Sequence, residues 1–205
     1  MRGEDTADSH PTQRIGYRAA VDADGIRRAA RALSAENHAG MIRSFYPFWD
    51  SMYRPFLIGA VKALPADRFH WKPRPEVFTA CQILVHIAEC ERGWIHGTLD
   101  GGPYEEWVVP VDDNDPSRGW KTVIDAPDHA SLLRLLEEWH RPTQRWLEKP
   151  ISELSRVVTS RGPGRPDRTM TVHWVLDNMQ QHEIHHRAQL LLYFRLMGLT
   201  PPTSM

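Results

Sequence analysis

The segment "TVHWVLDNMQQHEIHHRAQLLLYFRLMG", residues 171–198, carries the clearest helical period in the chain. Apolar and histidine side chains recur there at steps of three and four, which places them on one stripe of a helix. The stripe consists of Val172, Val175, Met179, His182, His186, Leu190 (or Gln189), Tyr193 and Met197. Gly198 and Pro201 follow as C-terminal stop signals. We therefore predict a helix over residues 171–197 whose stripe faces the protein core.

Two histidines on this stripe are spaced for a shared metal ion. His182 and His186 are one helical turn apart, so their rings can converge on one ion. The stretch HEIHH also satisfies the H-E-x-x-H pattern of zinc proteases, in which Glu183 would be the general base. No Asp, Glu or His follows to complete such a site, and Gln189 and Leu192 stand where the extended pattern needs Gly and His. The residues that follow the two histidines therefore do not support a zinc protease.

Three further helices are predicted upstream from apolar spacing and from Pro and Gly punctuation. The first covers residues 41–64, where Pro47 and Pro55 are expected to kink or split it. The second begins at Thr79, which stands three residues before Gln82 in the spacing of a capping box. Each helix needs partners, because its apolar stripe must be buried against other helices.

The third predicted helix starts near Asp125 or Asp128 and ends before Pro150. A long connection rich in Gly, Pro and Asp precedes it, so we expect a crossover rather than a tight turn. Residues 156–170 alternate weakly around a Gly/Pro turn, which is typical of a small hairpin or an ordered loop. The predicted fold is all-α: a four-helix bundle with a long crossover between helices two and three, and a small hairpin before helix four.

Length and composition predict one folded domain, because 205 residues with 41% apolar content can bury a sizeable core. Residues 1–36 are polar and mixed in charge, so they are assigned to a partly flexible N-terminal extension, and residues 37–205 to the helical domain. Lys and Arg number 25 against 26 Asp and Glu, which favours neither nucleic acid nor an anionic membrane as a partner. With only Cys81 and Cys90 and no apolar leader, a cytoplasmic location is expected.

The second predicted helix offers a third metal ligand. His86 lies on its apolar stripe, within "ILVHIAECERGW", residues 83–94. A single histidine on an apolar face is more often packed or hydrogen-bonded in a core. Three unpaired imidazoles would be costly to bury, whereas coordination to a metal satisfies their lone pairs. We therefore predict a metal site in the bundle core, made of His86, His182 and His186.

The neighbours of these histidines have alternative interpretations. His185 falls off the stripe, so packing or hydrogen bonding is favoured over metal binding. Cys90 is interpreted as a small core residue, with a role beside the metal or a thiol substrate as the alternative. Glu89 and Glu91 flank the stripe, and solvated carboxylates are favoured over partners of a ligand imidazole. Arg187 is expected to face outward or to pair with an acid.

These motifs resemble the DinB-like (DNA-damage-inducible) metal-binding four-helix family, which includes bacterial low-molecular-weight thiol S-transferases. The resemblance covers about residues 41–202 and rests on three stretches: "ALPADRFHWKP", "LVHIAECERGW" and "HEIHHRAQLLLYFRLMGLTPP". The last is similar to the family's H-x-x-H-H-R-x-Q signature. The resemblance implies a divalent metal held by His86, His182 and His186. Ala188, where the family often has Gly, and the N-terminal extension depart from the pattern without touching the ligands.

Three neutral imidazoles leave a coordination position open, which is typical of catalytic metal sites. The resemblance implies that the metal activates a small thiol for transfer to an electrophile, so a metal-dependent thiol S-transferase is the first hypothesis. A non-catalytic metal-binding or stress-response bundle is the alternative, and a metal-dependent hydrolase is less favoured. No catalytic side chain is assigned.

Ligation by three histidines suits zinc, nickel and iron alike, so the metal is expected to be divalent without a chosen identity. The expected partners are a small thiol, an electrophilic substrate and a second copy of the chain in a homodimer. Neither nucleic acid nor a membrane is expected as a partner.

Overall fold

The computed structural model describes residues 40–103, 105–124, 128–161 and 166–202. The predicted N-terminal extension, residues 1–36, lies outside these ranges. The long helices are α2 (Arg54–Ala63), α3 (Ala80–Glu91), α4 (His129–Leu147) and α5 (Val172–Leu196). Shorter helical turns are η1 (Ile42–Phe45), η2 (Trp49–Tyr53), η3 (Ala66–Arg68), η4 (Arg92–Leu99), η5 (Pro116–Arg118) and η6 (Ile151–Ser155). No helix within the described ranges is long and apolar enough to cross a lipid bilayer.

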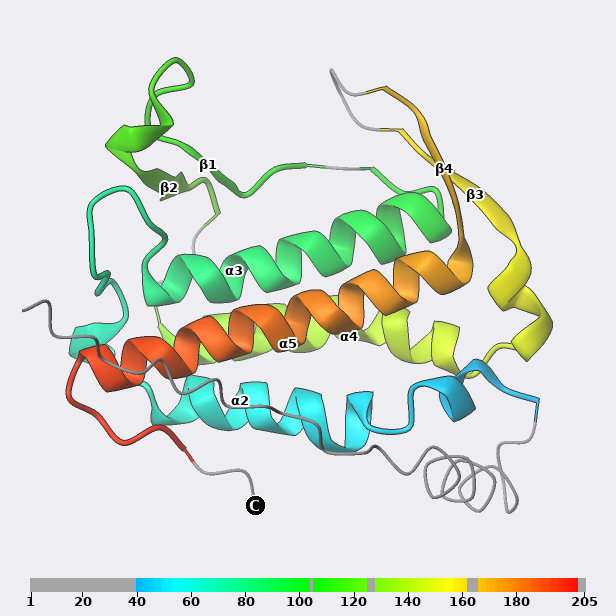
Figure 1. Cartoon of the computed structure of the whole chain (residues 1–205), viewed down its shortest axis with the longest axis horizontal. Helices are drawn as coiled ribbons and strands as arrows, with labels where there is room; N and C mark the ends of the chain where they lie inside the picture. Colours follow the sequence, from blue (N-terminus) through cyan, green and yellow to red (C-terminus); the bar gives the residue numbers. More distant parts are fainter. Residues whose placement is uncertain (1–39, 104, 125–127, 162–165, 203–205) are drawn as a thin grey trace, which may run out of the picture.

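The four long helices form a bundle in which chain neighbours are not always packing neighbours. Helix α3 packs against α4 and α5. Helix α2 packs against the same two helices from the opposite side of the bundle (Figure 1). The bundle therefore places α3 and α5 side by side, although the whole of α4 separates them in the chain.

Side-chain caps mark the starts of α3, α4 and α5. At α3, the Thr79 hydroxyl accepts the Gln82 backbone N–H at 3.1 Å, and Gln82 Oε1 accepts the Thr79 N–H at 2.8 Å, so the predicted capping box is present. Of the two predicted starts of α4, the structure uses Asp128, which accepts the Ser131 N–H at 2.7 Å. Thr171 caps α5 in the same way. These caps satisfy N–H groups that have no partner within the helix.

The first predicted helix is divided where proline interrupts it. Pro47 lies between η1 and the π-helical turn η2, and η2 runs directly into α2. Pro55 does not divide the helix: it lies at the second position of α2, directly after the point where the π-helical turn η2 changes to α-helix. Helix α3 likewise continues as the π-helical segment η4.

Two small antiparallel sheets accompany the helices, so the predicted all-α class is only approximate. Strands β3 (Val157–Ser160) and β4 (Arg168–Thr171) form the predicted hairpin before α5. Strands β1 (Val108–Pro110) and β2 (Trp120–Thr122) form a second ribbon within the predicted crossover between α3 and α4. The ribbon has no clear signal in the sequence, because its short strands lie among Gly, Pro and Asp residues.

The core consists of two apolar clusters that follow one another along the bundle. One cluster is built around residues such as Leu57, Leu84 and Leu136, and the other includes Trp49 and Trp146. A layer of buried polar side chains lies where the long helices pass from one cluster to the other. Its members are Arg54, Glu91, His140 and Glu183.

Candidate metal centre

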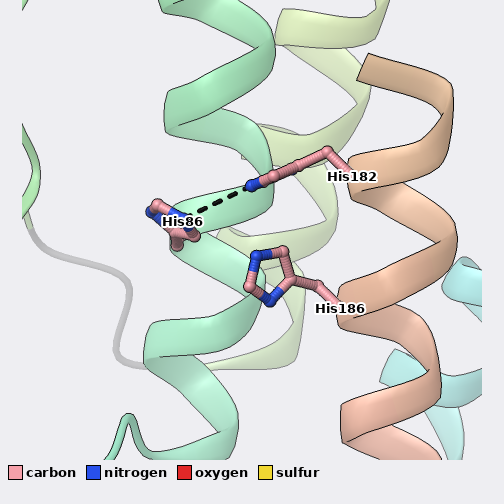
Figure 2. A group of neighbouring side chains, drawn as sticks. All are labelled: His86, His182 and His186. Carbon is pink, nitrogen blue, oxygen red and sulfur yellow. Dashed lines mark hydrogen bonds between the residues drawn. The ribbon is translucent and has the colours of Figure 1, made fainter. Parts of the chain in front are cut away.

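The three predicted ligands meet between α3 and α5, as Figure 2 shows. One ligand nitrogen from each of His86, His182 and His186 lies within 4.8 Å of the other two. The Nε2 atoms of His86 and His182 are 3.4 Å apart. All three residues are half-buried, and 24% of the His86 side chain is exposed. The group therefore lies at the helix interface, within reach of solvent, rather than deep in the core.

Glu89 sets the orientation of the His86 ring. Its Oε2 lies 3.0 Å from His86 Nδ1, so Nδ1 carries the proton and donates it to the carboxylate. Its Oε1 accepts the backbone N–H of Trp107 at 2.5 Å and of Val108 at 3.4 Å. Glu89 is only 4% exposed, so the solvated carboxylate favoured from the sequence is wrong. His86 is left with a lone pair on Nε2, the atom that faces His182.

A side-chain amide plays the same part for His186. His186 Nδ1 donates to Gln189 Oε1 at 2.8 Å, and Gln189 Nε2 donates in turn to His185 Nε2 at 2.9 Å. The Nε2 of His186 is therefore free to face the other two rings (Figure 2). His185 is exposed and takes no part in the three-nitrogen group. A spacing of three residues on a helix, for Glu89 after His86 and for Gln189 after His186, is the signal that identifies both partners.

The arrangement fits a metal ion better than it fits hydrogen bonding among the rings. Lone pairs of His86 and His186 converge, and a single N–H on His182 can satisfy only one of them. Two nitrogens bound tetrahedrally to one zinc ion at ~2.0–2.1 Å would lie about 3.3 Å apart. The Nε2 atoms of His86 and His182 lie 3.4 Å apart, which is close to that distance. The chemistry of the donor set therefore suits one divalent ion.

The electrostatic surroundings keep two of these rings neutral. Burial, together with the neighbouring imidazoles, lowers the pKa of His182 to about 3. Burial lowers the pKa of His186 to about 4, although the hydrogen bond to Gln189 acts in the opposite direction. Neutral rings offer the lone pairs that a metal requires. At neutral pH, no proton has to leave either ring before a metal binds.

Cys90 lies beside the three histidines. Its Sγ is 3.6 Å from His86 Nε2 and 3.7 Å from His86 Nδ1. The residue is half-buried and also packs against the apolar cluster around Trp49. The thiol therefore contacts a candidate ligand as well as the core.

Glu183 is directed away from the candidate metal centre. Its Oε2 accepts the Trp49 indole N–H at 3.1 Å and lies 2.9 Å from Arg54 Nη2. Only 2% of the residue is exposed. A protease base would have to face the metal, so this geometry agrees with the failure of the H-E-x-x-H pattern.

Glu183 belongs instead to the buried polar layer, which was not predicted from the sequence. Arg54 forms an ion pair with Glu91, and His140 Nδ1 lies 2.6 Å from Glu91 Oε1. His140 Nε2 lies 2.7 Å from Asp50 Oδ1. Burial disfavours the charged forms, but these contacts outweigh it, since they raise the pKa of His140 and lower that of Glu91 to about 2. The solvated role favoured for Glu91 is therefore wrong.

Comparisons with known proteins agree with the fold and the motifs. The DinB family model matches residues 44–204. A DinB-like protein of Bacillus cereus ATCC 10987 has a similar solved structure, with a TM-score of 0.56 and 16% identity over 81% of this chain and 99% of that one. A DinB-like protein of Bacillus subtilis gives a TM-score of 0.51 and 21% identity over 75% and 92% of the two chains. No curated protein matches the sequence. The chain belongs to the DinB family.

Proposed function

We propose that this protein binds a divalent metal ion through His86, His182 and His186, and that the metal centre transfers a small thiol to an electrophile. The observation that carries the proposal is the 3.4 Å approach of His86 Nε2 to His182 Nε2, with the Nδ1 of His86 already engaged by Glu89. The resemblance to a family that includes thiol S-transferases supports the choice of reaction.

The metal would supply Lewis acidity, which lowers the pKa of a thiol at the open coordination position. The protein would contribute the three imidazoles, two of which have their outer N–H groups held by Glu89 and Gln189. The three rings are half-buried rather than enclosed, so a small thiol would reach them from the solvent side. In the net reaction the thiol proton is released, a sulfur–carbon bond forms, and the leaving group departs with its electron pair.

Metal titration of single variants tests the binding site. His86→Ala, His182→Ala and His186→Ala should each weaken zinc or nickel binding by at least about tenfold, because each removes one of three ligands. His185→Ala is the comparison variant, since it removes a histidine of the same helix that contributes no nitrogen to the group and, among the described residues, hydrogen-bonds only to the Gln189 amide that holds His186. Calorimetry in a competing chelator measures the affinities. Wild-type affinity in His86→Ala would show that the third ligand is wrong.

Thiol consumption tests the reaction separately. Metal-loaded protein should accelerate the coupling of L-cysteine or glutathione to monobromobimane, and neither the metal-free protein nor His182→Ala should do so. The rate is read from the fluorescence of the bimane adduct. Tight metal binding without acceleration for any thiol in a broad panel would favour the non-catalytic metal-binding function.

A further inference from the structure

A second candidate binding site lies between α2 and α5, on the side of α5 that faces away from α3. A hollow of about 660 Å³ opens there, lined by both helices and by the residues that follow α5. Its volume falls within the usual range for small-molecule sites. The three histidines do not line it, so it is distinct from the candidate metal centre.

The described residues that line the hollow carry positive charge and no negative charge. Arg187 and Arg195 line it, and none of its described lining residues is acidic. The Arg187 guanidinium lies 5.5 Å from the ring centres of Tyr53 and Phe56. No carboxylate of the described ranges pairs with Arg187, and its Nη1 is buried without an acceptor. Within the described residues, Arg187 thus packs against aromatic rings and pairs with no acid, contrary to the expectation from the sequence.

A bound anion would balance the positive charge of the two arginines and supply an acceptor for Arg187. A buried N–H without an acceptor is unfavourable, whereas a carboxylate beside a guanidinium forms a strong charge-assisted hydrogen bond. Arg195 adds a second positive charge on the same side of α5, and within the described ranges its only hydrogen bond is to the Leu191 carbonyl. The rest of the lining is mainly apolar and includes Phe56, Leu191 and Pro201.

We propose that this hollow binds a small organic carboxylate with an apolar chain or ring. The carboxylate pairs with Arg187 and Arg195, and the apolar body lies against Phe56 and Leu191. This site is independent of the proposed metal chemistry.

Calorimetric titration with octanoate tests the charge requirement. Wild-type protein should bind octanoate more tightly than butyrate and should not bind 1-octanol comparably. Arg187→Gln and Arg195→Gln should each weaken octanoate binding by about tenfold or more, as expected for the loss of a charged hydrogen bond. Arg134→Gln is the matched control, because Arg134 is exposed on α4 and bonds only to Ser131 among the described residues.

Gly59 offers a test that does not remove charge. A Cβ added at this position of α2 meets no atom within 4 Å, and Gly59 lines the hollow. Gly59→Leu should therefore fill the hollow and abolish octanoate binding, while the melting temperature and the zinc affinity stay at least at wild-type values.

A metal-stripped sample separates this site from the metal centre, because carboxylates can also coordinate metals. Octanoate should bind equally well after EDTA treatment and in His182→Ala. Binding that is lost with the metal, binding unchanged in both Arg187→Gln and Gly59→Leu, or equal binding of 1-octanol would each overturn the proposal. No binding of octanoate by the wild type at millimolar concentration would also overturn it.

Discussion

Glu89 connects a candidate metal ligand to a distant ribbon of the chain. One carboxylate oxygen accepts the Nδ1–H of His86, and the other accepts backbone N–H groups at the start of β1. Both oxygens act as acceptors, which a carboxylate provides and an amide does not. Position 89 therefore requires a carboxylate, and not only a side chain of this length.

Glu89→Gln tests this requirement. A glutamine has one acceptor oxygen and one donor nitrogen, so it cannot accept from both the His86 Nδ1–H and the Trp107 N–H. Metal affinity should fall by about 10- to 100-fold, the usual effect of removing a hydrogen-bond partner of a metal ligand. Competition with a chromogenic chelator measures the change, and Glu76→Gln, an exposed site, serves as the control. An unchanged affinity would show that Glu89 does not position His86.

At the scale of elements, one side chain joins the start of α3 to the ribbon of β1 and β2. Gln82 Oε1 accepts the Thr79 N–H in the capping box, and Gln82 Nε2 donates to the Trp120 carbonyl of β2 at 2.7 Å. The ribbon is thus held to α3 at both ends, by Gln82 and by Glu89. This attachment explains how short strands without a large sheet keep a defined position.

Gln82→Ala should destabilise the protein more than Thr79→Ala does. Loss of the Thr79 cap is expected to lower the free energy of unfolding by about 1 kcal/mol. Gln82→Ala removes the reciprocal cap bond and the ribbon contact together, so about 2 kcal/mol is expected. Urea unfolding followed by circular dichroism measures both, with Thr169→Ala on an exposed strand position as the control. Equal losses in the two variants would contradict the double role.

At the scale of the whole molecule, the buried polar layer divides the apolar core into its two clusters. Arg54, Glu91, His140 and Glu183 come from the four long helices, and each lies where its helix passes between the two apolar clusters. Their contacts connect the helices that surround the core. Removing one partner from such a layer leaves an uncompensated buried charge, which is strongly destabilising.

Because Glu91 in this layer has a lowered pKa, we expect the free energy of unfolding to fall in acid. Arg54 and His140 hold the pKa of Glu91 near 2, below its ordinary value of 4.5, despite its burial. A carboxylate with a depressed pKa stabilises the fold above the unfolded-state value, and this stabilisation is lost as the pH falls through 4.5 towards 2. The contribution at neutral pH is on the order of 3 kcal/mol.

Urea unfolding of the wild type and of Glu91→Gln at several pH values between 7 and 3 measures this effect. The variant should be less stable at pH 7 and should lose less stability on acidification. The lowered pKa of Asp50 adds to the acid loss in both proteins, because the variant keeps the Asp50 carboxylate beside His140. Parallel pH profiles for the two proteins would show that Glu91 does not carry the effect.

The sequence by itself determined those features that depend on neighbouring residues. The period of α5, the capping box at Thr79 and the hairpin of β3 and β4 arise from local spacing and turn chemistry, and these were predicted. The cap at Thr171 is equally local, but residue 171 was predicted to lie inside the helix. The spacing of His182 and His186 on one turn is also local. Their meeting with His86 was predicted because all three lie on apolar stripes and match a family motif.

Only the tertiary structure decided the features that depend on contacts across the chain. Glu89 and Glu91 look solvated in the sequence, but packing buries both, since partners distant in the chain satisfy their carboxylates. His140 extends the apolar stripe of α4, yet its charge depends on Asp50 and Glu91, which no local pattern connects to it. Arg187 lies beside α2 only because the bundle places α2 against α5. Charge and burial at such positions depend on which helices pack together, and local spacing does not determine that.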